Sequence, residues 1–105
     1  MNIAVFCSAN ADIDPRFYEA TAALGRWCAE KGHTVIFGGT NLGLMECVAK
    51  AAHEAGGRVV GVVPKFVEEG GKESTYMDEV HHCENLSDRK DTLNTLCDVA
   101  VALPG

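Results

Sequence analysis

Short runs of apolar residues alternate along this chain with longer segments of helical periodicity, and this alternation constrains the fold. The runs cover residues 3–7, 33–37, 58–63 and 98–103, with a weaker run over 79–83. Apolar character that is continuous along a run is typical of parallel strands buried on both faces. Strands that alternate with helices predict an α/β fold: a doubly wound parallel sheet of about five strands in a three-layer α/β/α arrangement.

The first predicted helix has clear end signals. Asp14 and Pro15 suit the N-cap and the first helical position, and Gly32 suits the position just after the last turn. Residues at helical spacing predict its buried face: Phe17, Thr21, Leu24 and Cys28, with Ala20 and Trp27 beside them.

A strand, two glycines and a helix follow one another in the middle of the chain. The run over 34–37 stops at Gly38 and Gly39, and a helical pattern begins at Gly43 and continues to Ala55. Glycine allows positive φ and close approach to a ligand, and the helix N-terminus supplies free N–H groups. The turn therefore suits an anion such as phosphate, although tight connections in α/β sheets need glycine without any ligand. Its spacing matches neither the dinucleotide fingerprint nor the Walker loop.

Two cations at the start of the last predicted helix are a second candidate site. Ser87 suits the N-cap, which places Arg89 and Lys90 in the first turn. Cations oppose the helix dipole there unless an anion binds beside them, and the planar guanidinium of arginine suits a phosphate. The alternative is a solvated pair offset by Asp88 and Asp91.

Two loops are expected at the carboxyl edge of the sheet, where doubly wound folds bind ligands. Ser8 follows the first strand and would donate to a phosphate or ribose, or else bond only to water or backbone. Residues 65–77 are charged and rich in glycine, which predicts a mobile loop over this edge and a candidate lid.

Composition limits the partners and the compartment. The 105 residues make one domain, 1–105, and the net charge of −6 argues against binding to nucleic acid or anionic membrane. Five cysteines without a C-x-x-C pair indicate buried thiols in a reducing cytoplasm, and the N-terminus lacks the features of a signal peptide. His81 and His82 are adjacent on a predicted strand and face opposite sides, so we expect no metal site.

These pieces, in this order, resemble the LONELY GUY (LOG) family, whose fold is Rossmann-like. The resemblance covers essentially the whole chain, and the Gly-Gly-x3-Gly-Leu-Met and Arg-Lys elements are specific when found together. The matching segments are residues 5–8, 37–45, 60–64, 88–90 and 102–105.

The resemblance implies a phosphoribohydrolase that cleaves the N-glycosidic bond of AMP or an N6-modified AMP, such as a cytokinin nucleotide, with no metal or cofactor. Arg89 would be the catalytic arginine and Lys90 its neighbour in substrate binding. The other substrate-binding residues implied are Ser8, Gly38, Gly39, Gly43 and Met45.

Two departures from the family pattern affect these expectations. Ser8-Ala9-Asn10 stands where many relatives have Gly-Ser-Ser. The family signature Pro-Gly-Gly-x-Gly-Thr-x-x-Glu is reached only as Pro104-Gly105, so relative to the family we expect a chain truncated at its C-terminus, without the phosphate loop and the catalytic glutamate. Glu46 and Asp88 are the only carboxylates expected near the site.

Three functions stay open. The first is the nucleotide N-glycosidase, the second a non-catalytic nucleotide-binding module that acts as carrier or sensor, and the third a domain that only oligomerises. The strand over 98–103 should lie at a sheet edge with Val99, Val101 and Leu103 poorly covered, which favours association. We expect a homodimer, as in the family.

Overall fold

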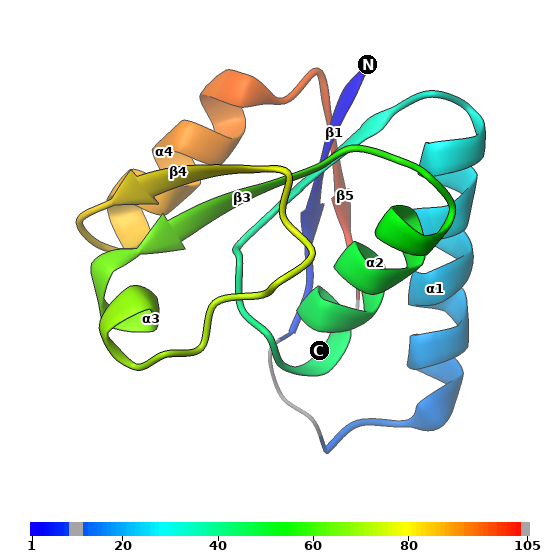
Figure 1. Ribbon diagram of the computed structural model, residues 1–105, viewed down its shortest axis with the longest axis horizontal. Coiled ribbons are helices and arrows are strands. Elements are labelled where there is room, and N and C mark those ends of the chain that lie inside the picture. Colours follow the sequence, from blue (N-terminus) through cyan, green and yellow to red (C-terminus); the bar gives the residue numbers. More distant parts are fainter. Residues whose placement is uncertain (9–11, 104–105) are drawn as a thin grey trace.

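The computed structural model describes residues 1–8 and 12–103, in which strands and helices alternate (Figure 1). In chain order they are β1 (Asn2–Phe6), α1 (Pro15–Glu30), β2 (Thr34–Phe37), α2 (Gly43–Glu54), β3 (Val59–Pro64), α3 (Lys65–Glu69), β4 (Glu79–Cys83), α4 (Leu86–Leu96) and β5 (Val99–Ala102).

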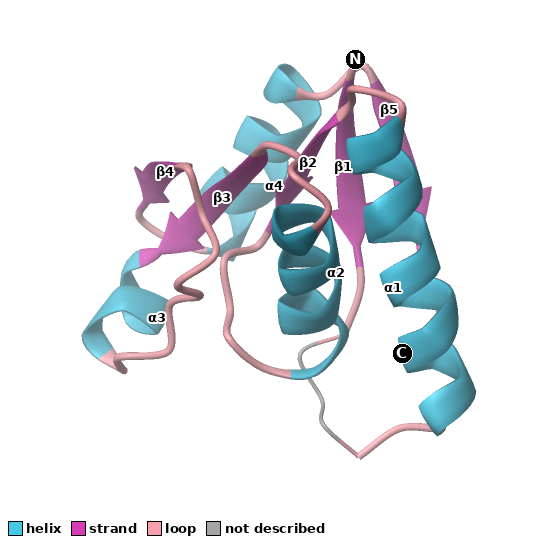
Figure 2. Cartoon of the chain, turned by 45° about the vertical axis from the view of Figure 1, so that its right-hand side comes forward, coloured by secondary structure: helices cyan, strands magenta, loops and turns pink. Residues whose placement is uncertain are grey.

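The strands form one parallel sheet in the order β4-β3-β2-β1-β5. The chain first builds outward from β1 to β4, and then crosses back so that β5 pairs with the other side of β1. Ile3 of β1 lies opposite Val35 of β2 and Val99 of β5. As Figure 2 shows, α1 and α2 cover one face of the sheet and α4 covers the other. The predicted doubly wound, three-layer α/β/α fold is confirmed.

Apolar side chains are buried on both faces of the central strands. All six residues of β3 are buried, as its continuous apolar sequence predicts. One core cluster joins β1, β2 and β3 to α1 and α2, and a second, smaller cluster joins β2 and β3 to Leu93 of α4. These layers hold the carboxyl ends of β1 and β2 beside the first turn of α4.

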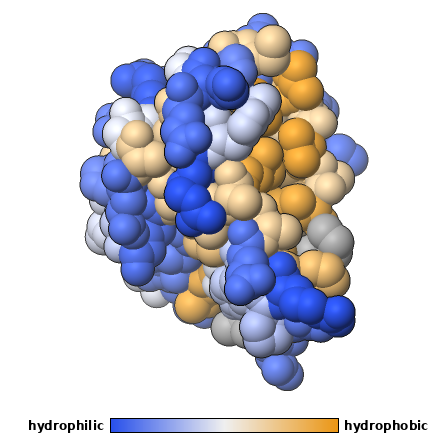
Figure 3. All heavy atoms as spheres, turned by 90° about the vertical axis from the view of Figure 1, so that its right-hand side faces the viewer, coloured by the Kyte–Doolittle hydropathy of each residue, from blue (hydrophilic) through white to orange (hydrophobic). Residues whose placement is uncertain are grey.

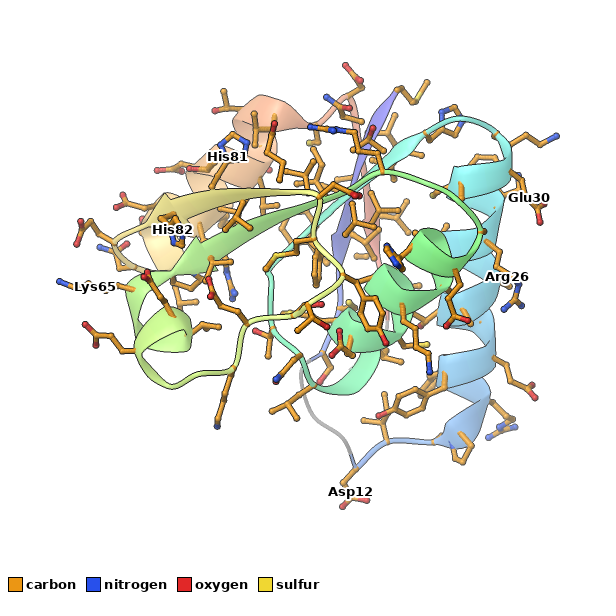
Figure 4. All side chains as sticks on the ribbon, viewed as in Figure 1. Asp12, Arg26, Glu30, Lys65, His81 and His82 are labelled. Atoms are coloured by element: carbon orange, nitrogen blue, oxygen red, sulfur yellow. The ribbon has the colours of Figure 1, made fainter. Side chains whose placement is uncertain are left out.

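The first helix has the predicted ends and most of the predicted buried face, since Thr21 and Cys28 are buried and Leu24 packs against the core, whereas Ala20 is exposed. Asp14 caps the helix by accepting the Arg16 N–H at 2.9 Å. The expectation that Phe17 and Trp27 face the core is wrong, since they are 37% and 46% exposed. The close contact with α2 runs instead through Gly25, where a Cβ would lie 2.7 Å from the Val48 carbonyl oxygen. Arg26 and Glu30 project from the outer side of α1 (Figure 4).

Two further expectations about local structure are corrected. Asn85, not Ser87, caps α4, because its side chain accepts the Asp88 N–H at 2.9 Å. The helix therefore begins at Leu86, two residues earlier than expected, so Arg89 ends its first turn and Lys90 lies in the second. The segment expected to be a loop from residue 65 begins with the short helix α3, whose Val67 is buried.

The two edges of the sheet differ in chemistry. At one edge, β5 leaves Val99 44% exposed, as predicted, and apolar side chains gather over part of the face shown in Figure 3. The expectation that Val101 and Leu103 are also poorly covered is wrong, because both are partly buried and pack against the core. At the other edge, β4 carries Glu79, which pairs with Arg58 and with His81. His82 points to the opposite side of β4 from His81 and pairs with Glu68 of α3 (Figure 4).

No helix within the described residues is both long and apolar enough to cross a membrane.

Candidate functional site

The turn between β2 and α2 uses its glycines in the way the sequence predicts, but the helix N-terminus is occupied. Gly39 and Gly43 have φ of +80° and +61°. The Ser8 carbonyl oxygen accepts the N–H groups of Leu44 and Met45 at 2.9 and 3.3 Å. These two donors, expected to be free for an anion, instead tie the end of β1 to the first turn of α2.

Arg89 reaches the same turn from α4. Its Nη1 donates to the Gly38 carbonyl oxygen at 3.2 Å. Gly38 has no side chain, and a Cβ there would lie 2.7 Å from Arg89 Nη1 and 3.1 Å from Met45 Sδ. The guanidinium and the thioether therefore occupy space that any larger residue at position 38 would fill.

A cavity of roughly 260 Å³ opens beside this contact. It lies between the carboxyl end of β1, the turn after β2 and the first turns of α4. The residues around it are Val5, Phe6, Cys7, Gly38, Met45, Leu86, Arg89, Lys90 and Leu93. This lining has two cations and no carboxylate, in a chain whose net charge is −6.

Among the described residues, no carboxylate balances the charge on Arg89. The side chain is half-buried, and within residues 1–8 and 12–103 no carboxylate pairs with it. Burial lowers the pKa of its guanidinium, and only the nearby Cys83 acts in the opposite direction. A bound anion would compensate this buried positive charge.

Cys7 contributes a neutral group to the cavity. Burial, assisted by the nearby Cys47, raises the pKa of its thiol from 9.0 to about 12. At neutral pH the thiol therefore adds no negative charge beside Arg89 and is not activated as a nucleophile.

A second cavity, of roughly 330 Å³, shares Met45 and Arg89 with the first. Its remaining walls come from the turn after β2 and from α3 with the residues that follow it: Thr40, Leu42, Phe66, Val67, Gly70 and Lys72. This lining also contains cations and no carboxylate. Arg89 therefore stands between two adjoining spaces, both of which suit an anionic ligand with an apolar part.

The largest cavity, of roughly 510 Å³, has the opposite character. It lies between α3, β4 and α4, and its lining includes Glu68, Glu84, Asp88 and Asp91 with a single cation, Lys65. Four carboxylates disfavour a phosphate, so the smaller cavities beside Arg89 are the better candidates. In the described part of the chain, no three acidic, histidine or cysteine side chains are grouped as metal ligands.

The structure brings together four of the residues predicted from sequence. Gly38, Met45, Arg89 and Lys90 surround the cavity. The other three, Ser8, Gly39 and Gly43, are not among its walls; they build the turn and fix the start of α2. Phe6 and Cys7 also line the cavity, and the sequence analysis does not single them out. Their position at the carboxyl end of the first strand could have indicated this, because ligands bind at that edge of the sheet.

The two carboxylates expected near the site are engaged elsewhere. Glu46 Oε1 accepts a hydrogen bond from Ser74 Oγ at 2.6 Å. Asp88 faces the acidic cavity on the other side of α4. Neither is a wall of the cavity beside Arg89 and Lys90. The family-signature residues Pro104 and Gly105, and residues Ala9 and Asn10, lie outside the described part of the chain.

Comparison with known proteins gives the family. A model of the SLOG cluster4 family matches residues 1–105. The chain belongs to the SLOG cluster4 family. Among the relatives of this SLOG chain is cytokinin riboside 5′-monophosphate phosphoribohydrolase LOG7 of Arabidopsis thaliana, 32% identical over 103 residues, which cover 98% of this chain and 48% of that protein. The enzyme of that name from Mycobacterium marinum is also 32% identical over 103 residues, covering 98% of this chain and 54% of that protein.

These relatives confirm the resemblance to the LOG family, and the SLOG chain spans about half the length of the curated relatives it matches. A solved structure, the molybdenum cofactor carrier protein MCP from Chlamydomonas reinhardtii, superposes with a TM-score of 0.84 at 28% identity. That match covers 99% of this chain and 62% of the carrier protein. The fold of this SLOG chain is thus shared by proteins with different named roles.

Proposed function

We propose that the SLOG chain binds a nucleoside 5′-monophosphate, AMP or an N6-modified AMP, in the cavity lined by Arg89 and Lys90. The observation that carries this proposal is the half-buried Arg89, which has a cavity in front of it and no carboxylate in the lining. A phosphate satisfies a guanidinium through charge-assisted hydrogen bonds, and the adjoining spaces leave room for the sugar and base.

The proposed reaction is hydrolysis of the N-glycosidic bond. Water adds to the anomeric carbon, the bond from that carbon to the base nitrogen breaks, and the base leaves with a proton while ribose 5-phosphate remains. In this reaction Arg89 and Lys90 hold the phosphorylated sugar, while Gly38 and Met45 shape the pocket. The names of the relatives support this assignment.

The rate should be limited by the missing carboxylate. Glycoside cleavage passes through an oxocarbenium-like state that a carboxylate stabilises or that an activated water attacks. Since the described lining contains no acid, we expect the 105-residue chain to bind nucleotide weakly and to release base slowly. A longer chain that supplied a carboxylate at this cavity would turn over faster.

A non-catalytic carrier or sensor is the second candidate. Two observations favour it: the acid-free lining, and the structural similarity to a protein named as a molybdenum cofactor carrier. A carrier needs the cations of the cavity but no carboxylate, so binding without product would distinguish it from the hydrolase.

The test measures binding and turnover on one sample. Calorimetry with AMP reports binding, and chromatography of the same incubation reports released adenine. Release that is lost in Arg89→Ala supports the hydrolase, and Arg89-dependent binding without release supports the carrier. If AMP neither binds nor reacts, both proposals are wrong.

We further propose that the protein acts in the cytoplasm as a homodimer, with a small-molecule nucleotide and not nucleic acid or membrane as its partner. The exposed edge of β5 and the negative net charge support this view.

A further inference from the structure

The residues after α3 lie across the carboxyl ends of β2 and β3 and bond to the turn that follows β2. We call residues 72–77 the crossing segment. Asn41 donates its N–H to the Lys72 carbonyl oxygen, and Ser74 donates its N–H to the Gly39 carbonyl oxygen, both at 2.8 Å. Thr40 and Glu73 form an antiparallel bridge between these two contacts. The crossing segment therefore pairs with residues 39–41 as a short strand would.

A buried hydroxyl fixes the crossing segment to α2. Ser74 is only 5% exposed, and its Oγ donates to Glu46 Oε1 at 2.6 Å. The same Oγ accepts the Tyr76 N–H at 3.2 Å. Since a hydrogen bond to a carboxylate is stronger than a neutral one, this contact reinforces the backbone bonds that hold Ser74 in place.

The turn held by Ser74 is the turn that Arg89 touches. Ser74 fixes the carbonyl of Gly39, and Arg89 Nη1 donates to the carbonyl of Gly38 at 3.2 Å. Only the two dihedral angles of Gly39 separate these neighbouring peptide groups. Gly39, with φ of +80°, has the conformational freedom of glycine, so its own chemistry does not hold the Gly38 carbonyl in place.

We propose that Ser74, through its hydrogen bond to Glu46, is a positioning residue for Arg89. The inference rests on the function proposed above, because it assigns to Ser74 and Glu46 the placement of the guanidinium that receives the phosphate. Without the Ser74–Glu46 bond the crossing segment keeps only its backbone bonds to residues 39–41. The Gly38 carbonyl is then less firmly oriented, and Arg89 points less steadily at the cavity.

A double-mutant cycle with AMP as the probe tests this role. Ser74→Ala should weaken AMP binding about fivefold, the usual worth of one hydrogen bond. In the Arg89→Ala background the same substitution should have no further effect, because Ser74 acts through Arg89. A purely structural contribution of Ser74 would instead lower affinity by the same factor in both backgrounds, and that additive result would overturn the inference.

Variants of Glu46 provide a second test of the same contact. Glu46→Gln keeps an acceptor for Ser74 and should retain most of the AMP affinity, whereas Glu46→Ala should resemble Ser74→Ala. Glu54→Ala is the matched control on α2, since it removes only the exposed pair with Lys50 and should leave affinity unchanged. Equal losses in the glutamine and alanine variants of Glu46 would contradict the role of the hydrogen bond.

A readout without ligand separates this inference from the proposed function. The side-chain Nε–H resonance of Arg89, identified by its loss in Arg89→Ala, should shift in Ser74→Ala and stay in place in Glu54→Ala. An unshifted resonance overturns the inference whether or not AMP binds. Absence of Arg89-dependent AMP binding with a shifted resonance rejects the proposed ligand and keeps the positioning role.

Discussion

Arg89 donates a hydrogen bond to the carbonyl oxygen of Gly38 from a helix 51 positions further along the chain. The contact joins the turn after β2 to the first turn of α4, on the two sides of the cavity. It leaves the remaining guanidinium donors available to the cavity, since no carboxylate of the described residues pairs with this side chain.

Arg89→Ala should weaken AMP binding about thirtyfold, the worth of charge-assisted hydrogen bonds to one phosphate. Arg89→Lys should recover little of the loss, because an ammonium lacks the planar fork and would not reach Gly38 and the phosphate together. Calorimetry measures both. Arg16→Ala is the control, since Arg16 is exposed and pairs only with Asp14 in the described structure. Equal affinities in wild type and Arg89→Ala would contradict the site.

Gly38→Ala should lower AMP affinity nearly as much as Arg89→Ala. The added methyl group would lie 2.7 Å from Arg89 Nη1, so the guanidinium must move. Gly32→Ala is the comparison: Gly32 has φ of +76° with nothing near its missing Cβ, so the change should cost about 1 kcal/mol of stability and leave binding intact. Urea unfolding and calorimetry on both variants separate the two effects. Unchanged AMP affinity in Gly38→Ala would contradict the prediction, because the guanidinium would then bind the ligand equally well from a different position.

Stability should fall in alkaline solution because of Cys7. Its pKa is raised from 9.0 to about 12, so above pH 9 the unfolded thiol ionises while the folded one stays neutral. The contribution of the neutral Cys7 thiol to the free energy of unfolding is therefore complete below pH 9 and is lost as the pH rises from 9 toward 12. The free energy of unfolding of the wild-type chain should fall between pH 8 and pH 10. Over the same range that of Cys7→Ala should fall by about 1 kcal/mol less. Equal drops in urea titrations would refute the burial of this thiol.

Val99→Lys should convert the expected homodimer into a monomer. Val99 is 44% exposed on the edge strand β5, and a lysine on such a strand opposes pairing with another chain. Sedimentation at micromolar concentration measures the change. Trp27→Lys, on the exposed side of α1, tests whether the helix takes part as well. A wild-type chain that sediments as a monomer would rule out the dimer.

The strands could be predicted because their signal is local. A run such as 58–63 is apolar at almost every position, which is typical of a parallel strand covered on both faces. The closeness of Gly38, Met45, Arg89 and Lys90 also follows from the pattern, since the carboxyl ends of parallel strands and the starts of the following helices meet at one edge.

The errors arose where a distant part of the chain decides the outcome. Phe17 and Trp27 fit a helical stripe, but the contact of Gly25 with α2 sets which side of α1 is buried. Asn85 and Ser87 are both good caps by residue type, and the structure uses Asn85. Nothing in the sequence indicates that Ser74 and Glu46 bond to each other, because they are two polar residues far apart in the chain. The sequence therefore predicts a mobile loop where the structure has the crossing segment.

The unequal edges of the sheet limit how far copies of this chain can assemble. Two copies joined along β5 through a twofold axis would form one continuous sheet, and each outer end of that sheet would be β4. Glu79, His81 and His82 place polar side chains with polar partners on that strand, which discourages the addition of a third copy. If copies pair through β5, assembly should therefore stop at two copies, because the strands left at the outer edges resist further pairing.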